Sequence, residues 1–198
     1  MKCKSKNTKE CEQYMLVKKT KIPGCFELYP EIKSDERGSF IKIFNNELFT
    51  SLGLSTECRE SYYTTSYKNV LRGLHFQKPP FDHSKLVFCI SGEVLDVIVD
   101  LRVGSPTYKQ FEVFDLSSEK ANGIYLETGL AHGFYVKSSK ATLLYNVSTV
   151  YSSEHDSGVL WNSIGFEWPN ANPILSTRDM SFKALEDFYS PFIYKNSK

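Results

Sequence analysis

The chain has 198 residues, a formal net charge of +1 and an aromatic fraction of 14%. This length predicts one domain with a substantial core, and the near-neutral charge argues against nucleic acid or an acidic membrane surface as the main partner. Five cysteines at irregular spacing, without a Cys-x-x-Cys pair, favour free thiols over a disulfide framework or a zinc site.

The start of the chain does not suggest a signal peptide. The start, Met1-Lys2-Cys3-Lys4, is charged where a signal peptide would be apolar. No apolar run approaches the roughly 20 residues of a transmembrane helix. We therefore expect a cytoplasmic protein without membrane contact. Residues 1–16 are polar and rich in lysine, so we expect a frayed extension there and a single domain over residues 17–198.

Short strands separated by turns are predicted along most of the chain. Prolines and glycines break the first stretch into pieces that suit edge strands. A short helix is expected where Asn45 or Asn46 can cap its start and Gly53 can end it. The expected strands cover residues 17–31 in pieces, 39–44, 60–66, 70–76, 85–90, 93–101, 108–116, 123–126, 134–136 and 141–150, and the expected helices cover 45–52 and 182–188.

The strand predicted at residues 93–101 carries two carboxylates on an otherwise apolar face. At a period of two residues, Asp96 and Asp100 share one side of the strand with Val94 and Ile98. Evenly spaced strands, turns between them and almost no helix predict an all-β sandwich or barrel.

Histidines next to cations are the first candidates for chemistry. His75 is preceded by Arg72 and followed, after a loop, by Lys85. For His83 and His155 we expect only hydrogen-bonding roles within the structure. A histidine beside cations can take a proton from a bound anion, because its pKa is close to working pH.

His132 lies among glycines at residues 129–133, where we expect a corner with little bulk around the imidazole. A metal site needs about three or four ligands, and position 77, on the same strand face as His75, is Gln rather than a second His. The sequence also lacks a Gly-x-Ser-x-Gly elbow and a glycine-rich phosphate loop. The remaining imidazoles, cations and tyrosines suit proton transfer on an anionic substrate, without metal or cofactor.

An ordered set of motifs resembles the cupin-fold nucleotide-sugar epimerases, typified by dTDP-4-dehydrorhamnose 3,5-epimerase. The resemblance covers about residues 23–182. It implies an all-β double-stranded β-helix, the cupin or jelly-roll fold, with short peripheral helices. It also implies a homodimer, a nucleotide diphospho-sugar substrate and no cofactor. The motifs are residues 35–40, 70–77, 85–87, 92–94, 96–97, 99–102, 105–107, 129–134, 145 with 151, 168–169 and 175–179.

The resemblance implies a role for each residue of the site. His75, held by Asp179, would remove the proton beside the C4 ketone, and Tyr145 would return a proton on the opposite face. Lys85 would stabilise the enolate oxygen. The implied binding residues are Arg72 and His132 at the diphosphate and sugar, Arg178 in the site wall, Tyr151 stacked on the nucleobase, and Arg37 reaching into the site of the neighbouring subunit.

Four positions around the expected nucleoside depart from the usual pattern of the family: Lys42, Glu60, Tyr62 and Asp156. Glu60 could accept a hydrogen bond from the amino group of cytosine, with Lys42 balancing its charge. CDP- and dTDP-linked substrates remain alternatives, with CDP slightly favoured. The four departures are also explained by neutral sequence drift at the rim of the site. Tyr62 is bulkier than the family's Asn, which favours inversion at C3 alone over inversion at C3 and C5.

The predicted function is therefore a cofactor-independent epimerase of a CDP- or dTDP-linked 4-keto-6-deoxyglucose, in deoxysugar biosynthesis for surface polysaccharide. A 3,4-ketoisomerase of the same substrate class is one alternative. A non-catalytic sugar-nucleotide-binding cupin is the other. A base and an acid on opposite faces favour the epimerase, because inversion of a carbon needs both.

Overall fold

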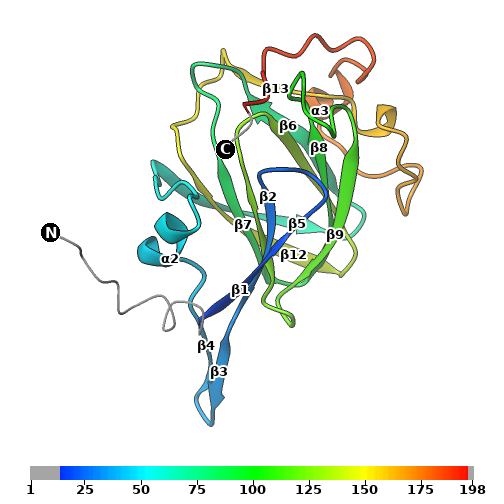
Figure 1. Cartoon of the computed structure of the whole chain (residues 1–198). Coiled ribbons are helices and arrows are strands. Elements are labelled where there is room, and N and C mark those ends of the chain that lie inside the picture. The colour runs from blue at the N-terminus through cyan, green and yellow to red at the C-terminus, as the bar shows by residue number, and fades with distance from the viewer. Residues whose placement is uncertain (1–13, 196–198) are drawn as a thin grey trace, which may run out of the picture.

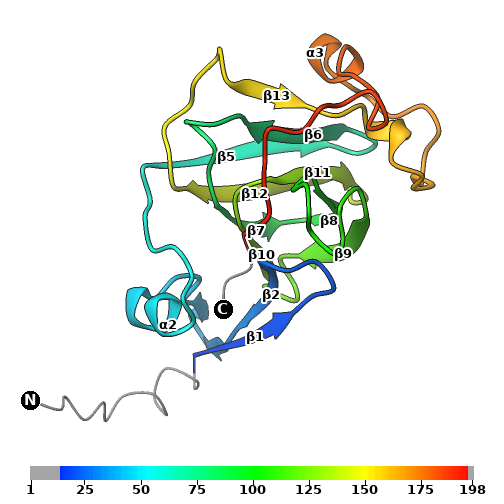
Figure 2. The ribbon, with the colours of Figure 1, turned by 45° about the horizontal axis from the view of Figure 1, so that its top comes forward.

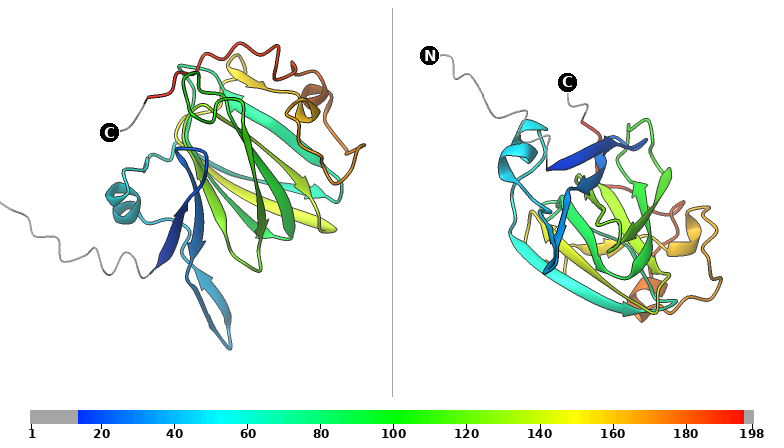
Figure 3. Two further views of the ribbon diagram at one scale, coloured as in Figure 1. Left: turned by 45° about the vertical axis from the view of Figure 1, so that its right-hand side comes forward. Right: turned by 90° about the horizontal axis from the view of Figure 1, so that it is seen from below.

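Two antiparallel sheets hold most of the chain (Figure 1). The computed structural model describes residues 14–195. One sheet has the order β1 (Met15–Lys19), β2 (Cys25–Pro30), β10 (Gly123–Leu126), β7 (Lys85–Ser91), β12 (Lys140–Val147) and β5 (Glu60–Tyr67). The other has the order β13 (Asp156–Gly158), β6 (Leu71–Gln77), β11 (Leu130–Val136), β8 (Glu93–Asp100) and β9 (Phe111–Ser117). These two facing sheets form the predicted double-stranded β-helix, seen from further directions in Figure 3.

The remaining elements are short and peripheral. Within residues 14–195 there are three small helices: α2 (Asn46–Ser51), η1 (Trp161–Ser163) and α3 (Thr177–Met180). The α2 helix confirms the predicted caps, because the side chain of Asn45 accepts a hydrogen bond from the Leu48 N–H (2.9 Å) and Gly53 takes a positive φ of 71° just after the helix.

The main core lies between the sheets because alternate side chains of each strand turn inward. Two further clusters cover the outer faces, one under α2 and one under the C-terminal segment. Burial of each large aliphatic or aromatic side chain contributes about 1.5–3 kcal/mol to the free energy of folding, relative to leaving it exposed. Representative fully or nearly buried residues are Val87, Ile98 and Leu143 between the sheets, Leu48 and Phe49 from α2, and Trp168, Leu185 and Phe192 from the C-terminal segment.

Both carboxylates predicted on the apolar face of β8 are fully buried, and each has a partner. Asp100 accepts hydrogen bonds from Arg102 Nε (2.9 Å) and Ser105 Oγ (2.6 Å). Asp96 pairs with His132 Nε2 (2.8 Å). A buried charge is costly without such partners, so Asp100 fixes the end of β8, whereas Asp96 lies next to the cavity described below.

The start of the domain differs from the prediction. β1 begins at Met15, which is buried, two residues before the expected domain start at residue 17. Strand pairing with β2 explains this, since Met15 is opposite Pro30 in the ladder. Residues 1–13 of the expected frayed extension lie outside the described residues.

The predicted helix at residues 182–188 is wrong. The helix of this region is α3, one turn earlier, where the Ser176 side chain caps the start by accepting from the Asp179 N–H (3.1 Å). The apolar residues that suggested a helix instead pack separately: Phe182 lies edge-on to His75, and Phe188 lies edge-on to Phe76. Tertiary contacts therefore override the local pattern.

The corner predicted at residues 129–133 is also wrong. The turn is made by Thr128 and Gly129, and β11 already begins at Leu130. His132 is inside the strand, opposite His75 of β6 and Ile98 of β8. The glycine at 133 serves close packing, because a Cβ there would meet the Arg72 carbonyl at 2.8 Å and the Leu74 side chain at 2.7 Å.

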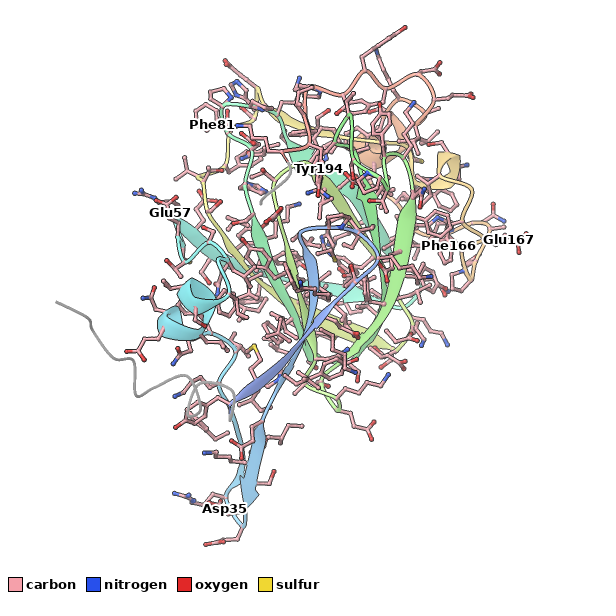
Figure 4. All side chains as sticks on the ribbon, in the orientation of Figure 1. Asp35, Glu57, Phe81, Phe166, Glu167 and Tyr194 are labelled. Atoms are coloured by element: carbon pink, nitrogen blue, oxygen red, sulfur yellow. The ribbon has the colours of Figure 1, made fainter. Side chains whose placement is uncertain are left out.

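A hairpin of β3 (Ile32–Asp35) and β4 (Gly38–Ile41) projects away from the two sheets (Figure 1). β4 ends at Ile41, before the predicted end at residue 44. Figure 4 labels Asp35 at its far end. Its side chains are almost all exposed, including Phe40 at 62% and Ile32 at 44%. Exposed apolar side chains on a projecting arm are typical of a surface that another chain covers.

No helix within residues 14–195 has the length and apolar composition needed to cross a membrane. The three cysteines in this range, Cys25, Cys58 and Cys89, are free thiols. Cys3 and Cys11, which we also expect to be free, lie outside the described residues.

Candidate active site

A cavity of about 450 Å³ opens between the two sheets. Strands from both sheets supply its walls, and loops close its rim. The lining residues are Glu60, Tyr62 and Thr64 from β5, Arg72, His75, Phe76 and Gln77 from β6, Lys85 from β7, His132 and Phe134 from β11, Tyr145 and Val147 from β12, Asp156 from β13, Arg178 from α3, and His83 and Tyr151 from loops.

His75 and Asp179 form a hydrogen-bonded pair at one wall. The α3 helix lies against β6 (Figure 2) and brings Asp179 to 2.8 Å from His75 Nε2. A carboxylate can only accept, so Nε2 carries the proton and the other ring nitrogen keeps its lone pair. Burial lowers the pKa of His75, outweighing the opposite effect of Asp179. The imidazole is therefore neutral at neutral pH and able to accept a proton.

Asp179 stays ionised under all ordinary conditions. Burial raises its pKa, but hydrogen bonds from His75, from the Gly73 N–H and from Ser176 outweigh burial and lower the pKa to about 2. The negative charge can thus stabilise an imidazolium at His75 after proton transfer.

Arg178 joins this pair to the cavity rim. Its guanidinium bonds to Asp156 (2.5 Å) and Asp179 (3.3 Å), and one of its NH2 groups lies 2.6 Å from His75 Nε2. Because both of those nitrogens are donors, the two carboxylates rather than His75 hold the guanidinium in place. Its positive charge helps to lower the pKa of His75.

Tyr145 faces the cavity from the opposite sheet and is only 5% exposed. Burial raises its pKa well above the ordinary value, with Asp96 and Tyr62 adding to the rise. The nearby cation Arg72 acts to lower this pKa, but burial outweighs its effect. The phenol stays protonated, which is the form required of a proton donor.

Lys85 lies at the start of β7 and is 6% exposed. Its ammonium donates a hydrogen bond to the His75 carbonyl (3.0 Å), which holds it beside the base. Burial lowers its pKa to about 8. A desolvated cation at this place interacts strongly with an oxyanion formed in the cavity.

His132 and Arg72 complete the deep part of the cavity. His132 is held by Asp96, whose second oxygen, Oδ1, is buried without a partner among the described residues. Arg72 donates from Nε to Ser66 Oγ (2.9 Å), which leaves its terminal nitrogens free for an anion.

The structure does not bring Arg37 or Lys42 to this cavity. Arg37 is at the tip of the β3–β4 hairpin and pairs with Asp35. The Lys42 ammonium lies 4.6 Å from the ring centre of Tyr14. Glu60 instead accepts a hydrogen bond from the Tyr151 N–H (3.0 Å), so the predicted pairing of Glu60 with Lys42 is wrong. Lys42 follows the projecting hairpin, which carries it away from β5.

Sequence reasoning missed several lining residues. His83 bonds to Gln77 Nε2 and Thr149 Oγ1 (both 3.2 Å), the structural role we expected, but it also lines the cavity. Burial lowers its pKa to about 3, so it is neutral. Thr64 could have been found from the period-two spacing that it shares with Glu60 and Tyr62 on β5. Within residues 14–195, no three His, Cys, Asp or Glu side chains are placed to hold a metal ion.

Comparison with known proteins places this geometry in a family. Residues 19–187 match the family model described as dTDP-4-dehydrorhamnose 3,5-epimerase. An enzyme of that name from Shigella flexneri is 40% identical over 176 residues, which cover 87% of this chain and 97% of the relative. A dTDP-4-dehydrorhamnose 3-epimerase from Streptomyces niveus is 36% identical, over 84% of this chain and 82% of that protein.

A solved structure agrees with the sequence match. The dTDP-6-deoxy-D-glucose-3,5-epimerase of Legionella pneumophila, in complex with dTDP-4-keto-L-rhamnose, has a TM-score of 0.87 and 32% identity. The match covers 92% of this chain and all of that one. The chain therefore belongs to the dTDP-4-dehydrorhamnose 3,5-epimerase family.

Proposed function

We propose that this protein is an epimerase that inverts C3 and C5 of a dTDP-linked 4-keto-6-deoxyhexose in deoxysugar biosynthesis. The observation that carries the proposal is the placement of a neutral His75–Asp179 pair and a protonated Tyr145 in walls of one cavity that belong to opposite sheets. An inverting proton transfer needs a base on one face of the carbon and an acid on the other.

The reaction follows from these groups. His75 takes the proton from the carbon beside the ketone, and the electron pair of that C–H bond moves into an enolate. Asp179 stabilises the resulting imidazolium, and Lys85 stabilises the enolate oxygen. Tyr145 then delivers its hydroxyl proton to the other face, which inverts the carbon. A well-placed donor to the oxyanion contributes about 3–4 kcal/mol to this step.

The other cavity residues suit the nucleoside diphosphate. Arg72 and His132 are the proposed ligands of the diphosphate and sugar, with Arg178 lining the site. Tyr151, 60% exposed at the rim, is the proposed stacking platform for the base. Glu60 and Asp156 lie close by, but Glu60 is already used to hold the Tyr151 backbone.

A dTDP substrate is preferred over CDP. CDP was favoured because Glu60 could accept a hydrogen bond from the cytosine amino group, with Lys42 balancing its charge. In the structure Lys42 lies beside Tyr14, and Glu60 already accepts a hydrogen bond from the Tyr151 N–H. The relatives named above are dTDP-sugar epimerases. Two of the three carry "3,5-epimerase" in their names, which supports inversion at both carbons over the expectation of C3 alone.

A panel of dTDP-, CDP-, UDP- and GDP-linked 4-keto-6-deoxyglucose tests the nucleotide. We expect turnover to be fastest with the dTDP sugar, and dTDP to give the largest rise in melting temperature of the four free nucleotides. Faster turnover of the CDP sugar, with a matching rise in melting temperature with CDP, would contradict the choice of nucleotide. No turnover of any of the four would contradict the proposed function.

Substitution of Lys85 tests the oxyanion role. We expect Lys85→Met to lower kcat by about 10²–10³-fold with a smaller change in KM, because the ammonium is needed when the enolate forms. The lysine pKa is lowered to about 8, so its charge, and with it the rate, should fall as pH rises through that value. Lys85→Arg should move the decline to higher pH. A rise in KM with unchanged kcat would instead assign Lys85 to substrate binding.

We further propose a homodimer in which Arg37 enters the neighbouring site. The projecting hairpin, its exposed apolar side chains and the distance of Arg37 from its own cavity support this arrangement. Light scattering should give twice the chain mass of 22.7 kDa. Mixing Arg37→Ala with His75→Ala protein should restore activity, because a hybrid dimer has one site with both residues. A mixture no more active than its parts would contradict the crossed arrangement.

The 3,4-ketoisomerase alternative has weaker support. Moving a ketone between neighbouring carbons does not require an acid across the cavity from the base. The position of Tyr145 opposite His75 therefore favours the epimerase.

A further inference from the structure

The proton donor Tyr145 is held between two other rings. β5 and β12 are antiparallel neighbours, and Tyr62 lies directly opposite Tyr145 in their register. The two phenol rings are stacked, with centres 4.9 Å apart and planes 15° from parallel. His132 lies edge-on to the same ring at 5.9 Å and 70°. One stacked and one edge-on contact together restrict the rotation of the Tyr145 ring.

The ring of Tyr62, rather than its hydroxyl, makes this contact. Among the described residues the Tyr62 hydroxyl has no hydrogen-bond partner, while its ring covers a side chain that is only 5% exposed. His132 is hydrogen-bonded to the buried Asp96 (2.8 Å), so the imidazole that lies edge-on to Tyr145 is held in place. Tyr62 is 40% exposed, and among the described residues no hydrogen bond anchors its side chain.

The orientation of Tyr145 determines whether the enolate carbon is inverted or returns to its starting configuration. The enolate carbon can take a proton from the imidazolium of His75, which restores the starting configuration, or from the hydroxyl of Tyr145, which inverts the carbon. The second route leaves a phenolate at Tyr145, which takes a proton from solvent, and an imidazolium at His75, which loses one to solvent. Misplacement of Tyr145 slows only the second route, because the first uses the other wall of the cavity.

We propose that Tyr62 is a positioning residue that holds the Tyr145 ring by stacking and thereby sets the ratio of inversion to return for each enolate. This inference rests on the proposed epimerase function. It assigns Tyr62 an action through Tyr145, in addition to its place in the cavity wall.

The test measures that ratio in deuterium oxide by proton NMR. Deuterium in recovered substrate of unchanged configuration reports return, and deuterium in inverted product reports inversion. Tyr62→Phe keeps the stacked ring and should keep the wild-type ratio. Tyr62→Leu removes the ring and should lower the ratio by about three- to tenfold, the range expected for losing one aromatic pair. Tyr63→Leu is the matched control, because Tyr63 is the next residue of β5, points to the opposite face and is 70% exposed.

The outcomes separate the possible failures. If Tyr62→Leu lowers exchange and inversion equally, Tyr62 supports the fold only, and the inference is overturned. Tyr62→Asn provides a second ring-free variant if the Leu variant does not fold, and thermal melting checks both. If the wild-type protein itself exchanges no deuterium with any 4-keto sugar, the proposed function fails, whatever the variants do.

Discussion

His75→Ala should abolish solvent deuterium uptake into the substrate, with a loss of at least about 10²–10⁴-fold in rate. His75 lines the cavity and is hydrogen-bonded to Asp179, a carboxylate from α3 whose pKa of about 2 keeps it ionised. The uptake is measured by proton NMR with the 4-keto sugar in deuterium oxide. Substrate binding should persist, since Arg72 and Tyr151 are unchanged.

His155→Ala is the matched control for this substitution. His155 bonds to Ser152 Oγ (2.8 Å) and does not line the cavity, so its variant should exchange deuterium at the wild-type rate. Normal uptake in His75→Ala would remove His75 as the base.

The pH dependence of the same step has a definite sign. Burial lowers the pKa of His75 below its usual value of about 6.5. The base is therefore neutral, and active, to lower pH than an exposed histidine would be. Asp179→Asn removes the hydrogen-bonded charge that raises this pKa, so it should lower the pKa further while it lowers the rate.

Tyr145→Phe should separate the two halves of the reaction. His75 remains, so deuterium uptake into substrate of unchanged configuration should continue. Inversion should fall by at least about 10²-fold, because the variant has no hydroxyl proton to deliver to the opposite face. The measurement is the ratio of inverted product to exchanged substrate. The ring is retained, so the stack on Tyr62 and the packing against His132 stay intact.

Tyr63→Phe is the control for Tyr145→Phe, since it removes a phenol hydroxyl from the neighbouring strand outside the cavity. Its exchange and inversion should both match the wild type. Inversion at the wild-type rate in Tyr145→Phe would show that another group, such as water, supplies the second proton.

Local patterns in the sequence predicted the strands well. Period-two alternation predicted β8 and the face of β8 on which Asp96 and Asp100 lie. The cap of α2 was predictable because Asn45 and Gly53 act within one turn of the helix. Such features depend on neighbours in sequence.

The errors all come from contacts between distant parts of the chain. The helix expected at 182–188 is absent because Phe182 and Phe188 each pack against β6. Burial between the sheets raises the pKa of Tyr145, and this burial could not be predicted from the sequence neighbours of that residue. Lys42 and Glu60 are not paired because Lys42 lies at the base of the projecting hairpin, beside Tyr14, whereas Glu60 lies on β5 and holds Tyr151.

The residues of the site were predicted through ordered motifs rather than through spacing. Nothing in the spacing alone joins His75 to Asp179 across 104 positions, or Tyr62 to Tyr145 across two strands. The structure brings these pairs together and leaves Arg37 outside its own cavity.

The most direct test is proton NMR of the wild-type protein with dTDP-4-keto-6-deoxyglucose in deuterium oxide. Two-sided proton transfer by His75 and Tyr145 predicts that solvent deuterium enters at C3 and at C5, and that the product carries inverted configuration at both carbons. A product formed without deuterium at either carbon, or a ketone moved to C3 without inversion, would contradict it.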